Sequence, residues 1–146
     1  VYRISTSKFG EGSTARSNKT PLGRHHIENK IGANAPVGTI FKARQNTGRI
    51  AKINGEIGDL VTSRIMWLKG LEAGKNRGTG IDSHKRYIYI HGTAEENKIG
   101  QKASHGCIRM FNHEVIELFN LVKEKTLVNI VMDQETVPNT EKSLDK

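Results

Sequence analysis

The sequence has a single cysteine. Cys107 stands alone among 146 residues, so no disulfide can form within the chain. A chain of this length can bury enough apolar surface to fold as one domain without such a crosslink. A lone cysteine is most often a small buried apolar residue, so its chemical meaning has to be judged from its neighbours.

Long apolar runs and aromatic residues are also scarce. No run approaches the roughly 20 apolar residues of a membrane-spanning helix, and we expect no such segment. The chain opens at Val1 without the basic start and apolar stretch of a signal peptide. Aromatic residues make up only 5% of the chain, which leaves few platforms on which bases could stack. We therefore expect no nucleic-acid partner, although the net charge of +8 favours a polyanionic one.

What is abundant is β-type patterning, separated by loops rich in glycine and polar residues. In Ile50–Ile57, for example, polar and apolar positions alternate, which is typical of a half-buried strand. The predicted strands are Val1–Thr6, His26–Ile31, Thr39–Ala43, Ile50–Ile57, Leu60–Leu68, Arg86–Ile90 and Leu127–Met132.

One segment has helical periodicity. Its apolar residues, at spacings of three and four, are Val115, Leu118, Phe119 and Val122. Asn112 is the predicted N-cap. The expected fold is thus mainly β, a single domain over residues 1–132 with one packed C-terminal helix, followed by a polar tail over residues 133–146.

The chemically informative residues are His91, at the end of a predicted strand, and Cys107, after a polar loop. A thiol with a pKa near ~8.5 needs a base to become an effective nucleophile at neutral pH. His105 lies two residues before Cys107, where side chains of an extended segment point in parallel. His91 comes from another strand and can face the thiol, so we predict Cys107 as nucleophile and His91 as its base.

The neighbours of this pair suggest supporting roles. The Gly92 carbonyl is the predicted acceptor that orients His91, and the amides of Gly106 and Cys107 are predicted oxyanion-hole donors. Ser104 and His105 are expected to form hydrogen bonds within the site. The substrate-binding residues are predicted to be Arg109, whose planar fork suits a carboxylate, together with Tyr89 and Trp67.

Two other interpretations of the same residues stay open. Cys107 could be an inert buried residue with His91 and His105 as surface residues. Alternatively, His91, His105 and Cys107 could bind zinc with one open position, although no CxxC or HExxH pattern supports it. The other histidines lack such companions and are predicted to lie on the surface; they are His25, His26, His84 and His113.

At these residues the sequence resembles the YkuD-type L,D-transpeptidase catalytic domain. That family carries a strand ending in His-Gly and, after a loop, Ser/Thr-His-Gly-Cys followed by an apolar residue and Arg or Asn. The matching segments here are 91–93 (His-Gly-Thr) and 104–110 (Ser-His-Gly-Cys-Ile-Arg-Met). Upstream, the turn at 20–24 (Thr-Pro-Leu-Gly-Arg) resembles the family's Thr-Pro-x-Gly turn. The resemblance spans about residues 4–131.

The resemblance implies a β-sandwich-like fold of mixed sheets and a location outside the cytoplasmic membrane. It implies that Cys107 attacks the carbonyl of the third residue of a peptidoglycan tetrapeptide stem and releases D-alanine. An amine of another stem, or of a wall-anchored protein, then takes the acyl group. No metal or organic cofactor is expected. If water takes the acyl group instead, the protein is an L,D-carboxypeptidase or endopeptidase, and a non-catalytic wall-binding module is a further alternative.

The sequence also departs from the family pattern. The family's fold begins with one or two strands before the segment that matches residues 1–6, so the first sheet is expected to be incomplete here. Gly92 stands where some members have a hydroxyl residue, which favours a backbone acceptor for the imidazole. The interval between His91 and Ser104 is short, which bears on the choice of acceptor more than on the chemistry.

Overall fold

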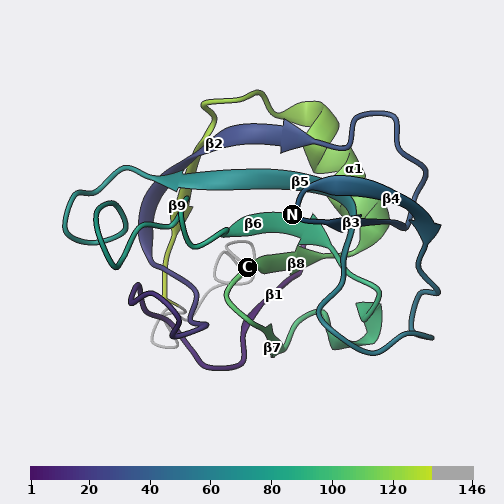
Figure 1. The fold of residues 1–146 in the computed structure, drawn as a ribbon, viewed down its shortest axis with the longest axis horizontal. Coiled ribbons are helices and arrows are strands. Elements are labelled where there is room, and N and C mark those ends of the chain that lie inside the picture. The colour runs from purple at the N-terminus through teal and green to yellow at the C-terminus, as the bar shows by residue number, and fades with distance from the viewer. Residues whose placement is uncertain (133–146) are drawn as a thin grey trace.

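The protein has a mostly β architecture, and its strands form one hydrogen-bonded sheet with both parallel and antiparallel pairs (Figure 1). This computed structural model describes residues 1–132. The strands are β1 (Ile4–Ser7), β2 (Gly23–Ile31), β3 (Thr39–Lys42), β4 (Gln45–Ile50), β5 (Val61–Gly70), β6 (Tyr89–Gly92), β7 (Lys102–Ser104), β8 (Ile108–Met110) and β9 (Leu127–Ile130). The helices are the short 3-10 helix η1 (Glu96–Lys98) and the α-helix α1 (Asn112–Leu121).

The strand order is β4-β3-β5-β6-β8-β1-β7, and β2 pairs with both β5 and β9. The pairing of β6 with β8 matters most for the site because it is parallel, with His91 opposite Arg109. Parallel neighbours need a crossover, which here is formed by η1 and β7. This crossover brings the two halves of the sequence motif onto adjacent strands.

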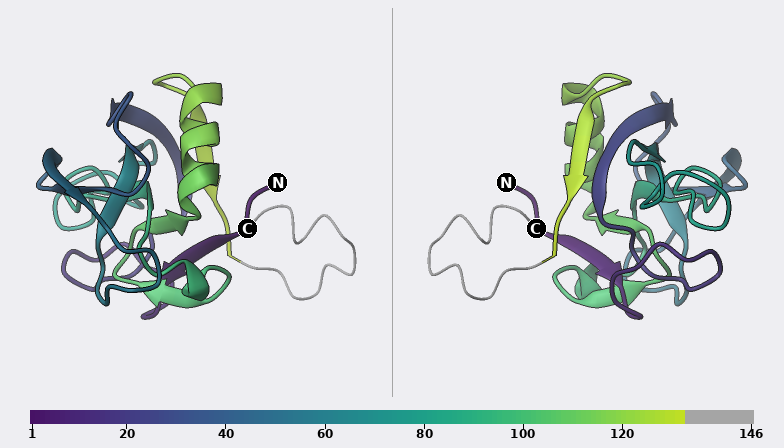
Figure 2. Two further views of the ribbon diagram at one scale, coloured as in Figure 1. Left: turned by 90° about the vertical axis from the view of Figure 1, so that its right-hand side faces the viewer. Right: turned by 90° about the vertical axis from the view of Figure 1, so that its left-hand side faces the viewer.

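Successive side chains of a strand point to opposite faces, so the central strands present two different surfaces. The face toward α1 is apolar. Its buried cluster, called here the helix-side core, contains Ile27, Met66, Leu68, Ile88, Ile90, Ile108, Met110, Val115 and Phe119. Figure 2 shows α1 on one side of the central strands, and the β3–β4 hairpin with the long β5–β6 loop on the other.

The opposite face has a mixed composition and is called here the site face. Its buried cluster is formed by Phe41, Ile65 and Tyr89, against which Trp67 and Cys107 pack. His91 and Arg109 lie on the same face, because they occupy alternate positions from Tyr89 and Cys107 along the same two chain segments. The alternation of side chains along the same strands therefore puts the apolar core on one face and the predicted site residues on the other.

The expected mainly β fold with one packed helix is confirmed, but several predicted elements differ. The strand predicted at Ile50–Ile57 is wrong. Only Ile50 belongs to a strand, the end of β4, and the chain then turns at 53–55. The Asn54-Gly55 dipeptide explains the turn, since Asn54 adopts a positive φ of 60°. Ala51 is buried in a small cluster with Ile40 and Ala94, but Ile57 is 95% exposed, so the apolar alternation does not continue along a core.

The remaining differences have local causes. β4 was not predicted because all six of its residues are exposed and it forms by pairing with β3. β7 lay in a predicted loop and forms by pairing with β1. The predicted strand Arg86–Ile90 begins only at Tyr89, because Tyr87 has a φ of 57°. The N-cap of α1 is Phe111 rather than Asn112. The predicted polar tail, residues 133–146, lies outside the described residues.

Candidate active site

His91 is positioned by the end of β6 and is almost completely buried, at 1% exposure. Its Nδ1 hydrogen-bonds to the carbonyl oxygen of Gly92, as the sequence predicted. A carbonyl can only accept, so Nδ1 carries the proton and Nε2 is left as the nitrogen that can accept one. Burial lowers the pKa of His91, against the opposing effects of Asp59 and the Gly92 carbonyl, which keeps the imidazole neutral near pH 7.

Gly92 permits the close approach of Asn112 and Thr62 to the end of β6. A Cβ built at this position would lie 2.5 Å from Oδ1 of Asn112 and 2.7 Å from the carbonyl oxygen of Thr62. Asn112, at the start of α1, is itself fully used: Oδ1 accepts from the hydroxyls of Thr62 and Ser63, and Nδ2 donates to the carbonyl of Thr93. The segment around Gly92 is therefore fixed by a buried polar network that joins β5, the end of β6 and α1.

The turn that carries Cys107 is closed by the Ser104 hydroxyl. Ser104 Oγ donates to the carbonyl of Cys107 at 2.6 Å and accepts from the Gly106 amide at 3.2 Å. The Gly106 carbonyl accepts from Thr20 Oγ1 at 3.0 Å, which ties in the upstream Thr-Pro segment. Gly106 has a φ of 120°, a conformation that favours glycine. Ser104 thus holds the turn that carries Cys107. Because the Gly106 amide already donates to Ser104, the role of this amide as an oxyanion-hole donor stays a prediction.

The thiol of Cys107 lies between two backbone groups of the chain segment that leads into β6. Sγ is 3.3 Å from the carbonyl oxygen of Tyr87, to which it can donate, and 3.3 Å from the amide nitrogen of Tyr89, from which it can accept. Burial raises the pKa of the thiol to about 12, helped by Asp59 and opposed by the Tyr89 amide, Arg109 and Arg86. The resting group is therefore a neutral thiol rather than a preformed thiolate.

The β6–β8 pairing puts His91 and the turn that carries Cys107 on neighbouring chain segments of the site face. Tyr89 donates its amide to Sγ and lies two positions before His91 on the same face. Within residues 1–132 the hydrogen-bond partners of the thiol are Tyr87 and Tyr89, not His91. The two predicted catalytic groups are on neighbouring segments, and the proton transfer between them stays a prediction.

Asp59 is a site residue that sequence reasoning missed. Its Oδ2 lies 3.0 Å from Nδ1 of His105, and its Oδ1 accepts from Arg109 at 2.6 and 3.0 Å. Burial opposes its ionisation, but the imidazoles of His91 and His105 together with Arg109 outweigh burial and lower its pKa. Asp59 sits in the loop after the wrongly predicted strand, where nothing in the sequence indicates proximity to the motif.

Arg109 was predicted to bind a substrate carboxylate, and the structure gives its guanidinium internal partners. The side chain is 1% exposed and lies between Asp59, at 2.6 Å, and Glu95, at 3.0 Å. A buried guanidinium requires such compensation. Direct binding of a substrate by Arg109 remains a prediction, and its observed contacts are those of a group that holds Asp59 and Glu95 in place.

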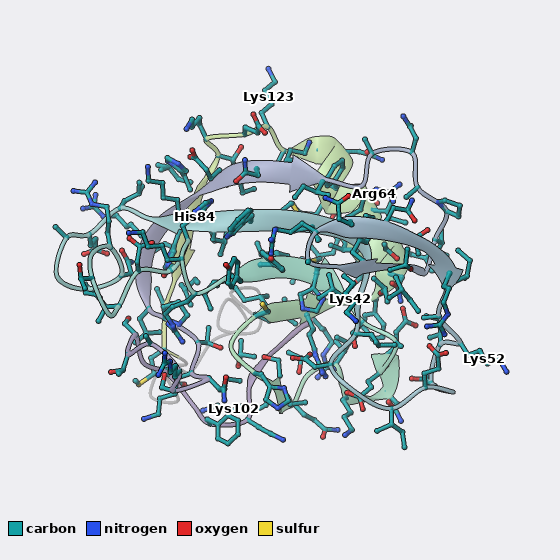
Figure 3. All side chains as sticks on the ribbon, in the orientation of Figure 1. Lys42, Lys52, Arg64, His84, Lys102 and Lys123 are labelled. Atoms are coloured by element: carbon teal, nitrogen blue, oxygen red, sulfur yellow. The ribbon has the colours of Figure 1, made fainter. Side chains whose placement is uncertain are left out.

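The predicted aromatic residues lie together beside the thiol. Trp67 stacks on His84 at a centroid distance of 4.0 Å and meets Tyr89 edge-on at 5.6 Å. Tyr87, half exposed, is tilted against Trp67 at 5.8 Å. The stacked position of His84, on the left of Figure 3, makes this histidine a partner of the cluster rather than the isolated surface residue that was predicted.

His25 corrects another prediction, because it is fully buried instead of lying on the surface. Its Nε2 is 2.8 Å from Ser83 Oγ and its Nδ1 is 2.9 Å from the Gly23 carbonyl. Burial lowers its pKa. This pair fastens the β5–β6 loop to β2 and has no exposed face with which to meet a substrate.

In residues 1–132, no group of three or more His, Cys, Asp or Glu side chains is placed to hold a metal ion. No helix in this part of the chain has the length and apolarity of a membrane span. A hollow of about 520 Å³ opens between the N-terminal segment, α1 and β9, but its lining contains neither His91 nor Cys107.

The sequence was compared with known proteins. The family described as the L,D-transpeptidase catalytic domain, YkuD, matches residues 1–130. The YkuD protein of Bacillus licheniformis is 46% identical over 46 residues, which are 32% of this chain and 28% of that protein. The YqjB protein of Bacillus subtilis is 45% identical over 51 residues, which are 35% of this chain and 29% of the relative. These matches span less than a third of either relative.

Among solved structures, L,D-transpeptidase 3 from Mycobacterium tuberculosis, in complex with a faropenem-derived adduct, has a TM-score of 0.53 and 14% identity. The comparison covers 90% of this chain and 44% of that one, and at this identity it establishes the fold alone. The family match is different, because it covers almost the whole described chain, including both halves of the motif on β6 and before β8. The chain belongs to the YkuD family of L,D-transpeptidase catalytic domains.

Proposed function

We propose that this domain is a peptidoglycan L,D-transpeptidase in which Cys107 is the nucleophile and His91 the general base. The observation that carries the proposal is the parallel β6–β8 pairing, which puts the end of the His-Gly strand beside the Cys107 turn on one face. The orientation of His91 supports it, because the Gly92 carbonyl holds the Nδ1 proton and leaves Nε2 free to act.

Acylation begins from a neutral pair, since burial favours the uncharged forms of both groups. As Sγ attacks the carbonyl carbon of the third stem residue, the thiol proton moves to Nε2 of His91. The tetrahedral intermediate then collapses, the bond to the D-alanine nitrogen breaks, and the imidazolium returns the proton to the leaving amine. The product is a thioester at Cys107 and free D-alanine.

Deacylation repeats these steps with an amine acceptor. The amine attacks the thioester carbonyl, gives a proton to His91, and Sγ leaves and is reprotonated. The proposed acceptor is the side-chain amine of another stem, or an amine of a wall-anchored protein. This places the substrate, and therefore the enzyme, outside the cytoplasmic membrane.

The test is mass spectrometry of the products formed from purified disaccharide-tetrapeptides by the wild type and by Cys107→Ala. Crosslinked dimers that lack one D-alanine, made by the wild type only, are the expected result. Disaccharide-tripeptide alone would show that water resolves the acyl-enzyme and that the protein is a carboxypeptidase. Product from Cys107→Ala would refute the nucleophile assignment. Thermal unfolding of both proteins is the control for folding.

A second test uses a carbapenem as a substrate analogue. Attack by Sγ opens the β-lactam ring and forms a thioester, so the intact mass of the protein should rise by the mass of one drug molecule. Cys107→Ala should show no increase. Absence of an adduct on the wild type, while an unfolded control remains alkylatable, would count against an activated Cys107.

A further inference from the structure

The β3–β4 hairpin has an unusual tip. Its two-residue loop, Ala43-Arg44, joins Lys42 to its partner Gln45, and both loop residues have positive φ, 48° and 64°. Such tight hairpin turns favour Asn and Gly, because other side chains are strained in this conformation. Strained residues persist where surrounding contacts hold them, and they are enriched at ligand-binding sites.

The contacts that hold Arg44 come from the aromatic residues beside the thiol. Its guanidinium lies 5.2 Å from the ring centroid of Trp67 and 4.9 Å from that of Tyr87. Nη1 donates to the Tyr89 hydroxyl at 3.1 Å. Tyr87 and Tyr89 are the two residues whose backbone groups contact Sγ of Cys107. The hairpin therefore presents a positive charge at the residues that frame the nucleophile.

Among residues 1–132, no Asp or Glu lies within ion-pair distance of Arg44, whereas Arg109 has two such partners and Arg49 on the same hairpin has one. Within the described residues, the partners of the Arg44 guanidinium are a neutral phenol and two ring faces, so the other N–H groups of the fork remain available. Arg86, a cation that acts on the thiol, already donates to the carbonyls of Gly12 and Lys19.

From this geometry we propose that Arg44 is a carboxylate-binding residue that selects an anionic acyl donor at Cys107. The planar fork of arginine binds carboxylates with two parallel hydrogen bonds. The aromatic faces orient the guanidinium without neutralising it. The inference rests on the proposed function for the identity of the donor, a stem peptide with a free carboxylate, but the anion site can be tested without turnover.

The direct test compares alkylation of Cys107 by iodoacetate, which carries a carboxylate, and by neutral iodoacetamide. Both reagents react with the same thiolate and release iodide, so the ratio of their rates cancels any change in the pKa of Cys107. The variant is Arg44→Asn, which removes the charge but suits the left-handed turn. Lys52→Gln is the matched control, because this exposed residue loses the same charge at the right-hand edge of Figure 3.

We expect Arg44→Asn to lower the iodoacetate-to-iodoacetamide ratio about fivefold, as the loss of one partly screened charge at the residues that frame the thiol predicts. Lys52→Gln should leave the ratio unchanged, and Arg44→Lys should retain most of it. Equal ratios in Arg44→Asn and Lys52→Gln would overturn the proposal. In the wild type, 1 M salt should bring the ratio close to that of Arg44→Asn.

The second arm uses stem peptides in which each carboxylate is replaced in turn by the amide. One of these replacements should raise KM for the wild type about tenfold, with kcat little changed, and should have no effect in Arg44→Asn. If the alkylation ratio falls as expected but no stem peptide is turned over, the anion site stands and the proposed function fails. If stem peptides are turned over but Arg44→Asn leaves the alkylation ratio unchanged, the proposed function stands and the anion site fails.

Discussion

The two faces of the central sheet are built from the same strands by opposite means. On the helix side, Met66, Leu68 and Ile90 pack into a buried apolar core. The site face is formed by the alternate positions of these strands. It holds His91 on β6, Arg109 on the neighbouring β8, and Cys107 directly before β8. Burial on the first face is favourable in itself. On the second face each buried polar group needs a particular partner to offset the cost of its burial.

The largest expected effect is on the site face. His91→Gln keeps a neutral side chain of similar reach but cannot take the thiol proton, so turnover should fall by roughly 10³-fold. The measurement is kcat/KM with the proposed tetrapeptide donor, and His105→Gln is the matched variant. A normal rate in His91→Gln together with a lost rate in His105→Gln would move the base role to His105, which Asp59 orients.

The next effect should appear on the helix side, and on stability instead of chemistry. Leu68 is completely buried, so Leu68→Ala should lower the free energy of unfolding by about 3 kcal/mol. Urea denaturation measures this change. The control is Ile57→Ala, which alters a side chain that is 95% exposed and should change stability by less than about 0.5 kcal/mol. A loss of turnover in the folded Leu68→Ala protein would break the division between the faces.

Asp59→Asn should affect both the stability of the protein and the reactivity of Cys107, but each less strongly than the two preceding substitutions. Arg109 would keep only Glu95 as a charged partner, and because the Asp59 side chain is 28% exposed we expect a stability loss of about 1–2 kcal/mol. Asp59 also helps to raise the pKa of Cys107, so its removal should lower that pKa. Alkylation by iodoacetamide at pH 9 should therefore be faster in Asp59→Asn than in Glu124→Gln, an exposed control. A slower reaction would contradict this electrostatic role.

The smallest effect is the response of stability to acid. Burial lowers the pKa values of His91 and His25, so the unfolded chain binds protons that the folded chain excludes. Stability is then fully present above the ordinary imidazole pKa of about 6.5 and is lost as pH falls below it. Urea midpoints at pH 7.5 and 5.5 measure this loss, which should be smaller in His91→Gln. An equal loss in both proteins would assign the effect to other groups.

The sequence predicted those parts of the fold in which local pattern and burial agree. The helix at α1 and the strands that became β2, β3 and β5 follow from apolar periodicity, and the mainly β class follows from their number. It failed at β4, whose residues are all exposed, and at Ile50–Ile57, whose alternation lies in an exposed loop. In both cases pairing and turn geometry decided the structure, not hydrophobicity.

At the site, the sequence by itself determined which groups can react: a lone thiol, two imidazoles near it along the chain, and a glycine after His91 whose carbonyl can accept a hydrogen bond. Only the tertiary structure decided what surrounds them. Asp59 and Arg44 come from a loop and a hairpin that local patterns do not connect to the motif. The guanidinium of Arg109 pairs with carboxylates of the protein itself. Reactivity belongs to residue types, whereas charge pairing and access depend on which distant segments the fold brings together.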